Sequence, residues 1–229
     1  MAGHDTGAAR ARVVLIGPMG AGKTTIGKRV AKALAAEFVD SDAEFVRRHG
    51  PIAAYFDLHG EASFRIEERR VVEQAVRREV VLSLGGGAVL DEGTRADLAG
   101  VPVVLLTTTA EAVRDRLGSG RPLVRGGVED WTRIFDSRRA VYESLADTVV
   151  DSSRRPITTL AAEVTAWVRE REAAAGRASA TPAGTSPAGT TRPAGAAPPA
   201  GTAQSTSTTQ STSTTEPAAP TGRPTGRRA

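Results

Sequence analysis

The segment Gly17-Pro-Met-Gly-Ala-Gly-Lys-Thr24 constrains the fold of this 229-residue chain more than any other feature. It fits a pattern of Gly, four residues of any kind, Gly-Lys, and then Ser or Thr; an apolar run, 12–16, precedes it and a helical pattern, 23–36, follows it. Glycines let consecutive backbone N–H groups turn toward an anion, and the helix N-terminus adds the positive end of its dipole. The segment therefore predicts a phosphate-binding loop rather than a chance glycine-rich turn.

Two polar side chains of this segment define the expected ligand further. Lys23 supplies a point charge for the β- and γ-phosphates of a nucleotide, and the Thr24 hydroxyl can coordinate Mg²⁺. The chain contains no Asn, which excludes the guanine-specific Asn-Lys-x-Asp motif and the catalytic loop of protein kinases. The motif thus predicts nucleotide binding and leaves the reaction open.

Strand-like and helical patterns alternate along residues 10–172. The expected strands are 12–16, 37–40, 80–84, 101–107 and 148–151. The expected helices are 23–36, 42–49, 52–59, 61–78, 110–117, 131–146 and 157–171. This alternation predicts an α/β fold with three αβα layers, in which helices cover both faces of a five-stranded parallel sheet.

The composition changes sharply near residue 173. Residues 173–229 contain no Val, Ile, Leu, Phe, Met, Tyr or Trp and consist largely of Ala, Gly, Pro, Ser and Thr. A segment with nothing to bury cannot offset the entropy cost of folding, so we expect a disordered low-complexity tail at 173–229. The expected organisation is therefore a flexible N-terminus at 1–11, one domain at 12–172, and this tail.

Charge and residue absences exclude several functional classes. The net charge of +4 belongs to residues 173–229, which hold five Arg and one Glu, so the remaining residues are balanced and we expect no nucleic-acid partner. The chain has no Cys, which excludes a disulfide framework, a thiol nucleophile and a zinc–thiolate site. Apolar runs are too short to cross a bilayer, and residues 1–12 lack the apolar stretch of a secretory signal. We therefore expect a cytoplasmic protein without a membrane partner.

Polar residues and glycines follow two of the expected strands. Asp40-Ser41-Asp42 follows the second strand and Gly85-Gly86-Gly87 the third, so both should open onto the same crevice as the phosphate-binding loop. Either carboxylate could help to hold Mg²⁺ or meet a substrate hydroxyl, although a helix N-cap alone would also place Asp there. Beside the phosphate-binding loop, the functional interpretation is the stronger one.

Arginines recur in three later segments. Arg65 and Glu68 are spaced i, i+3 and can pair on one helix face, Arg121 lies in the Gly/Arg-rich segment 118–128, and Arg138 begins a late helical stretch. For each of them, a solvated surface position is the alternative interpretation.

Taken together, the motifs resemble those of the shikimate kinase family over about residues 12–170. The resemblance is carried, in order, by residues 17–24, Asp40-Ser41-Asp42, Gly60-Glu-x-x-Phe-Arg-x-x-Glu68, Ser83 with the triple glycine, Arg121-Pro-Leu and Arg138-x-x-x-Tyr142. It implies a kinase of the P-loop type (EC 2.7.1.71) that transfers the γ-phosphoryl group of ATP to the 3-hydroxyl of shikimate, on the route to chorismate and the aromatic amino acids.

The resemblance also implies roles for individual residues. Catalysis would fall to Lys23, Asp42 and Arg121; ATP would contact Gly20, Ala21, Gly22, Lys23, Thr24, Thr25, Arg114 and Arg121. Shikimate would contact Asp42, Arg65, Gly86 and Arg138, and Mg²⁺ would take Thr24 and Asp40 as ligands. The substrate-binding region would span about 40–70, and the lid about 118–128.

Two departures from the family pattern and two rival functions remain open. Ala140 stands where the family commonly has Pro, and Arg139 adjoins Arg138, so the register of the substrate arginine is undecided. The rivals are another small-molecule kinase, of the gluconate type, and a catalytically silent nucleotide-binding module with an interaction tail. We expect ATP and shikimate as the only partners, and a monomer.

Overall fold

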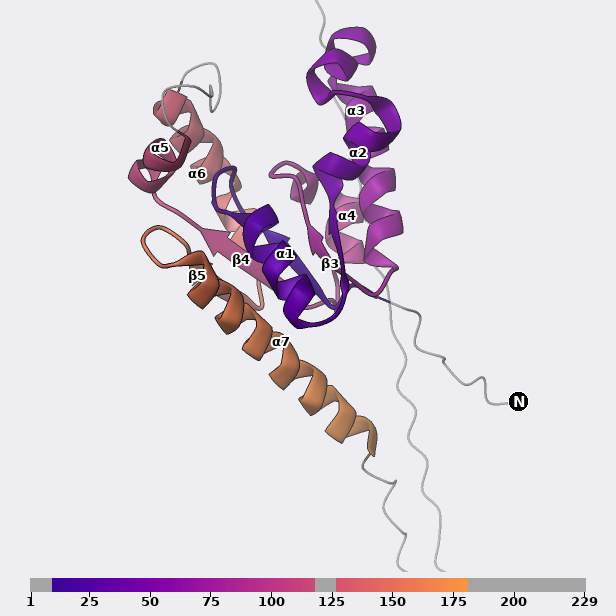
Figure 1. The fold of residues 1–229 in the computed structure, drawn as a ribbon. Coiled ribbons are helices and arrows are strands. Elements are labelled where there is room, and N and C mark those ends of the chain that lie inside the picture. Colours follow the sequence, from indigo (N-terminus) through magenta and orange to yellow (C-terminus); the bar gives the residue numbers. More distant parts are fainter. Residues whose placement is uncertain (1–9, 118–126, 181–229) are drawn as a thin grey trace, which may run out of the picture. The chain divides into compact units, whose positions relative to one another are not determined.

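Five parallel strands form one sheet, in the order β2-β3-β1-β4-β5, within the residues that the computed structural model describes, 10–117 and 127–180. The strands are β1 Val13–Ile16, β2 Glu37–Asp40, β3 Val80–Ser83, β4 Val103–Thr107 and β5 Thr148–Asp151. β1 is central, with Leu15 opposite Ser83 on one side and opposite Val104 on the other. The predicted five-stranded parallel sheet is therefore confirmed, and β1 delivers the segment after Ile16 to the middle of its carboxyl edge (Figure 1).

Helices cover both faces of this sheet, as predicted (Figure 1). Besides the short 3-10 helix η1 (Ala88–Leu90), they are α1 Lys23–Ala33, α2 Ser41–His49, α3 Ile52–Val76, α4 Glu92–Asp97, α5 Ala110–Leu117, α6 Gly127–Leu145 and α7 Ile157–Ala180. Alternate β1 side chains enter two separate cores: Val13 and Leu15 pack with α1 and α7, whereas Val14 and Ile16 pack with α3 and α6. Because successive side chains of a strand point to opposite faces, this continuous apolar run requires three layers.

Two elements between β3 and β4 have no counterpart in the sequence-based expectations. η1 and α4 occupy a stretch, 88–97, that lacks a long apolar period, and α4 is only six residues long. Its cap is local: the Asp91 carboxylate accepts a hydrogen bond from the backbone N–H of Thr94 at 2.8 Å. The predicted break between 52–59 and 61–78 is present, because Gly60 interrupts α3 with φ 77° and ψ 169°.

Helix α7 corrects the predicted start of the tail. The helix continues to Ala180, so residues 173–180 are helical and the expectation of disorder from 173 onward is wrong for them. This stretch is rich in Ala, the residue with the highest helix propensity, and it extends a helix already packed on the sheet, so it needs no apolar face of its own. The remainder of the predicted tail, like residues 1–9, lies outside the described residues.

Helix α6 begins at Gly127 rather than at Trp131, where the sequence analysis expected a helix to begin. The last two residues of the expected lid, 118–128, are therefore helical, and the lid itself stays a prediction. Residues 118–126, which include Arg121, lie outside the described residues.

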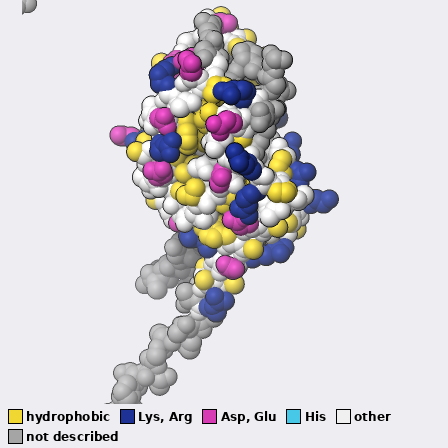
Figure 2. Space-filling model, turned by 90° about the vertical axis from the view of Figure 1, so that its left-hand side faces the viewer, with side chains coloured by type: hydrophobic (Ala, Val, Ile, Leu, Met, Phe, Trp, Pro, Cys, Tyr) yellow, Lys and Arg dark blue, Asp and Glu magenta, His cyan; other side chains and the backbone are white. Residues whose placement is uncertain are grey.

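The described surface is mixed in character. On the face in Figure 2, basic and acidic side chains are interspersed around a band of hydrophobic ones, rather than gathered by sign. Over 10–117 and 127–180, no helix is both long enough and apolar enough to span a bilayer.

Candidate active site

The glycine-rich turn after β1 forms an anion cradle. Gly17, Gly20 and Gly22 have φ values of 132°, 82° and 86°, a region that side-chain-bearing residues rarely adopt. At Gly17 a Cβ atom would lie only 2.2 Å from the Leu106 carbonyl oxygen, so glycine is also required by the close approach to β4. The N-terminus of α1 has no side-chain cap and no acidic residue in its first turn. Its amide groups and dipole are therefore directed at the cradle, where a phosphate would bind.

Lys23 supplies the positive charge of this cradle. Its Nζ atom donates to the carbonyl oxygens of Gly17 at 2.7 Å and Pro18 at 2.9 Å, which folds the side chain back over the turn. Burial lowers the pKa of Lys23 to about 8, while the carboxylates of Asp42 and Asp40 act in the opposite direction. A cation held in this low-dielectric position attracts phosphate oxygens more strongly than an exposed lysine would.

Thr24 and Asp40 form an oxygen-rich corner beside the cradle. The Thr24 hydroxyl donates to Asp40 Oδ2 at 2.7 Å, and Asp40 Oδ1 accepts from the backbone N–H groups of Asp42 and Ala43 at 3.2 Å each. Asp40 therefore caps α2, as the N-cap interpretation predicted, and also reaches Thr24; its role toward Mg²⁺ stays a prediction. A hydroxyl and a fixed carboxylate are ligands that Mg²⁺ accepts.

The rest of the described chain offers no dedicated metal cage. Over residues 10–117 and 127–180, no group of three or more His, Cys, Asp or Glu side chains could hold a metal ion.

Asp42 lies directly against the triple-glycine loop, which follows β3. A Cβ atom on Gly85 would lie 2.3 Å from Asp42 Oδ1, so only glycine allows the carboxylate this position. Withdrawal from bulk water and the nearby Asp40 carboxylate raise the pKa of Asp42, and Lys23 and Arg65 oppose this rise. A carboxylate with a raised pKa is a better proton acceptor than an ordinary aspartate.

Arg65 approaches the same loop from α3. Its Nη1 atom donates to Glu68 Oε2 at 2.6 Å and its Nη2 atom to Glu61 Oε1 at 3.1 Å, which confirms the i, i+3 pairing predicted with Glu68. A Cβ atom on Gly87 would lie 2.7 Å from Arg65 Nη1. Burial raises the pKa of Glu68 although Arg65 acts against it, and this buried carboxylate fixes the guanidinium beside the loop.

Arg138 reaches the loop from another helix, α6. Its Nη1 atom donates to the Gly86 carbonyl oxygen at 3.1 Å, and the buried Tyr142 hydroxyl donates to the same oxygen at 2.5 Å. Arg139, by contrast, pairs with Asp136 at 2.7 Å and stacks over the Phe135 ring. The structure thus places Arg138, and not Arg139, at the triple glycine, and α6 runs uninterrupted through Ala140.

The remaining predicted residues lie around the cradle or outside the described chain. Val113 of α5 packs against Gly20: a Cβ atom added to Gly20 would lie 3.1 Å from the Val113 side chain. The neighbouring Arg114 is exposed. Ala21 is buried, and Thr25 is exposed on α1. Arg121 is not among the described residues, so its predicted contact with phosphate remains a prediction.

Three residues at the site were given no role by the sequence analysis. Trp131 donates its indole N–H to the Met19 carbonyl at 2.8 Å and so ties α6 to the cradle. Ser41, only 2% exposed, accepts a hydrogen bond from the Gly85 backbone N–H at 2.8 Å. Tyr142 entered only as part of a motif. Contacts between residues 44 to 112 positions apart cannot be predicted from local spacing. The position of Ser41 between Asp40 and Asp42 was the one signal in the sequence that Ser41 lies at the site.

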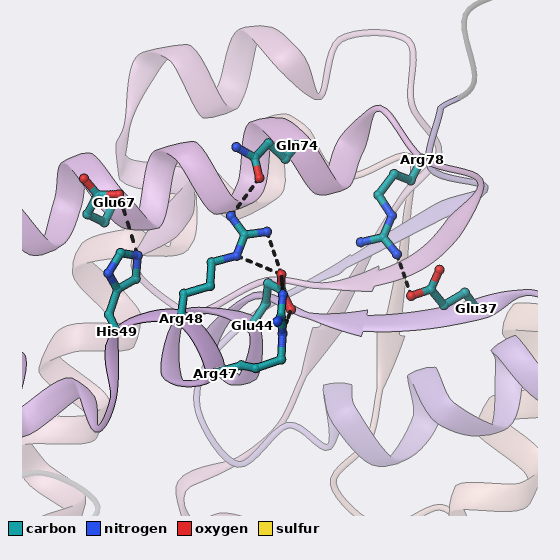
Figure 3. Close-up of polar contacts among 8 residues, drawn as sticks. All are labelled: Glu37, Glu44, Arg47, Arg48, His49, Glu67, Gln74 and Arg78. Atoms are coloured by element: carbon teal, nitrogen blue, oxygen red, sulfur yellow. Dashed lines mark hydrogen bonds and ion pairs between the residues drawn. The ribbon is translucent and has the colours of Figure 1, made fainter.

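A charged network outside the cleft holds α2 against α3 (Figure 3). Arg47 and Arg48 both donate to the Glu44 carboxylate, and Arg48 also donates to Gln74 of α3 at 2.7 Å. The two arginines lower the pKa of Glu44 to about 2, with Arg47 contributing most. Alongside β2, an open pocket of about 470 Å³ extends from Thr24 and Asp40 to this network.

Comparison with known proteins identifies the family. The family model "Shikimate kinase" matches residues 19–169. A shikimate kinase from Mannheimia succiniciproducens is 36% identical over 166 residues, which cover 69% of this chain and 94% of that protein. The solved shikimate kinase from Acinetobacter baumannii in complex with shikimate has a TM-score of 0.65 and 29% identity, and the match covers 72% of this chain and 95% of that one. A gluconokinase from Sinorhizobium meliloti 1021 has a TM-score of 0.54 at 19% identity over 76% of this chain and 98% of that one, which is a likeness of fold alone. The chain belongs to the shikimate kinase family.

Proposed function

We propose that this enzyme transfers the γ-phosphoryl group of ATP to the 3-hydroxyl of shikimate, giving shikimate 3-phosphate and ADP for aromatic amino acid synthesis. One observation carries the proposal. At a single edge of the sheet, an anion cradle with Lys23 lies beside Asp42, and two guanidinium groups, from Arg65 and Arg138, flank the same glycine loop. This arrangement suits a nucleotide on one side and a small carboxylated polyol on the other.

The phosphate side of the site neutralises and positions charge. Phosphoryl transfer passes through a loose transition state that depends on alignment and electrostatics more than on covalent chemistry. Lys23 would contact the β- and γ-phosphates, and the amide groups of the cradle would hold the α- and β-phosphates. A magnesium ion on Thr24 and Asp40 would neutralise further phosphate charge when bound. Arg121 and the segment 118–126 would cover the phosphates and exclude water, and Arg114 would lie near the adenine.

The acceptor side orients one hydroxyl toward the γ-phosphorus. Asp42 would align the 3-hydroxyl and accept its proton as the new O–P bond forms and the bond from the γ-phosphorus to the β–γ bridging oxygen breaks. The forks of Arg65 and Arg138 match the planar geometry of a carboxylate. Gly86 would let the backbone approach the substrate hydroxyls, because no Cβ atom intervenes.

A substrate panel tests this function. ADP formation would be measured by a coupled assay with ATP alone, with shikimate, with gluconate and with shikimate in which the carboxylate is replaced by a carboxamide. We expect strong stimulation by shikimate only, and ³¹P NMR of the product should locate the phosphoryl group on the 3-oxygen. Equal turnover of gluconate would favour the gluconate-type rival, and the absence of stimulation by any acceptor would favour a silent nucleotide-binding module.

The site supports two further expectations. We propose that a monomer is sufficient for activity. We also propose the cytoplasm as its compartment, because ATP is the phosphoryl donor.

A further inference from the structure

The triple-glycine loop is held by two residues to which the family resemblance assigns no substrate contact. We propose that Ser41 and Tyr142 are positioning residues, which lock the Gly85–Gly87 loop so that the acceptor-side groups keep a single arrangement. This inference rests on the proposed function and adds to it a cause for the geometry of the site.

Ser41 holds the first residue of the loop. Its Oγ atom is buried and accepts the Gly85 N–H at 2.8 Å, which links the start of α2 to the segment after β3. The same Gly85 forms the surface on which Asp42 lies, since the space for a Cβ atom is occupied by Asp42 Oδ1. Ser41 therefore fixes the base indirectly: its own backbone carries Asp42, and its hydroxyl fixes the surface beneath that carboxylate.

Tyr142 holds the second residue of the loop from α6. The Gly86 carbonyl accepts both the Tyr142 hydroxyl and Arg138 Nη1, so Tyr142 fixes the oxygen that also orients the proposed carboxylate fork. Burial raises the pKa of Tyr142, which keeps the hydroxyl protonated and able to donate. The hydroxyl belongs to a buried side chain of the core under the sheet, so the anchor is rigid.

The two anchors complement each other because glycines supply no stiffness of their own. Three consecutive glycines can adopt many backbone conformations, and only contacts from outside the loop select one. One anchor takes an N–H group and the other a carbonyl oxygen of adjacent residues. Loss of the Ser41 hydroxyl leaves the buried Gly85 N–H without this partner, and loss of the Tyr142 hydroxyl leaves the Gly86 carbonyl with Arg138 alone. Either loss lets the loop move, so loss of the second should then cost less than it does alone.

A double-mutant cycle tests this prediction on the full chain. The variants are Ser41→Ala, Tyr142→Phe and their combination, with kcat and KM for shikimate, the Kd of ATP and the melting temperature measured for each. Each single change should lower kcat/KM for shikimate about tenfold, whereas the combination should lower it about twentyfold to thirtyfold rather than a hundredfold. The Kd of ATP should stay within about twofold throughout, because the hydrogen bonds of Ser41 and Tyr142 go to the Gly85–Gly87 loop and not to residues of the cradle.

Thr165→Val serves as the matched control for lost stability. Thr165 is also buried, and its hydroxyl donates only to the Ala161 carbonyl within α7, away from the cleft. When Thr165→Val is added to Ser41→Ala or to Tyr142→Phe, kcat/KM for shikimate should stay at the value of that site variant, even where the melting temperature falls further. If the two site variants multiply to a hundredfold loss, if the Kd of ATP rises in parallel, or if neither variant affects transfer, the inference is wrong. Lack of shikimate turnover by the unmodified enzyme would instead count against the proposed function.

Discussion

Two arginine–carboxylate pairs in this protein share a spacing and a contact distance but differ in their surroundings. Arg65 and Glu68 in the cleft are i, i+3 neighbours with an N–O distance of 2.6 Å, as are Glu44 and Arg47 on the outer face of α2. In the cleft, Glu68 is 7% and Arg65 36% exposed, whereas on the outer face Glu44 is 16% and Arg47 69% exposed. The i, i+3 spacing is therefore the same although the order of Arg and Glu is reversed, and burial distinguishes the pair that serves the site.

The pKa values of the two glutamates shift in opposite directions. At the surface, the hydrogen bonds and charges of Arg47 and Arg48 together outweigh burial and lower the pKa of Glu44 to about 2. In the cleft, burial outweighs Arg65 and raises the pKa of Glu68. A surface pair is screened by water and contributes little, whereas removal of one member of a buried pair leaves an uncompensated group. The comparison predicts that site changes act on turnover and surface changes on stability.

The largest effect should follow from removal of the cradle cation. Lys23→Ala should reduce turnover about a thousandfold, because it removes the cation that Nζ holds over the glycine-rich turn. A coupled assay of ADP release measures this loss. Lys32→Ala, an exposed lysine in the last turn of the same helix, should leave the rate unchanged. A similar loss of turnover in both variants would contradict the claim that cleft and surface residues differ in their effect on turnover.

A methyl group added to the loop should have the next largest effect. In Gly85→Ala the new Cβ atom would lie 2.3 Å from Asp42 Oδ1 and 3.2 Å from Glu68 Oε1, so Asp42 must move. A displacement of about 1 Å can cost a hundredfold in rate, and we expect about that loss in kcat with ATP binding retained. At Gly176 in α7 the added Cβ would meet no other part of the chain within 4 Å, so Gly176→Ala should leave kcat and ATP binding unchanged. An active Gly85→Ala enzyme would show that Asp42 can act from another position.

The two glutamates can then be compared directly. Glu68→Gln keeps the shape of the side chain but removes the buried charge that orients Arg65, so the KM for shikimate should rise about tenfold. Glu44→Gln removes the corresponding charge at the surface and should leave that KM unchanged. Steady-state kinetics with shikimate as the varied substrate would measure both. If the two variants shift KM equally, burial is not what separates the pairs.

The smallest effect concerns acid stability. The pKa of Glu44 in the folded protein, about 2, lies below its usual value near 4.5. Its pairing therefore stabilises the fold above about pH 4.5, and this contribution is lost as the pH falls toward 2. Between these values, the melting temperature of Glu44→Gln should fall less steeply than that of the unmodified chain, by a few degrees at most. Parallel melting curves would show that the Arg47–Glu44–Arg48 contacts contribute no stability.

The sequence was sufficient to predict what depends on short-range pattern. Buried strands, the cradle around Gly17–Thr24 and the i, i+3 pair of Arg65 all follow from local spacing, and the carboxyl-edge rule brings Asp42 near the triple glycine. The contacts that fix the loop could not be predicted, because Ser41 and Gly85 meet only once β2 and β3 have paired. The helical start of the presumed tail was missed for a different reason: an Ala-rich stretch without core residues is ambiguous unless the preceding helix is known to be packed.

The central claim is that Asp42 serves the acceptor and not the nucleotide, and Asp42→Ala tests it most directly. The measurement pairs ATP binding by calorimetry with shikimate-dependent ADP formation on the same preparation. We predict an ATP dissociation constant within about twofold of that of the unmodified enzyme, together with a loss of phosphoryl transfer of at least about a hundredfold. Transfer to shikimate at a near-normal rate would contradict the account.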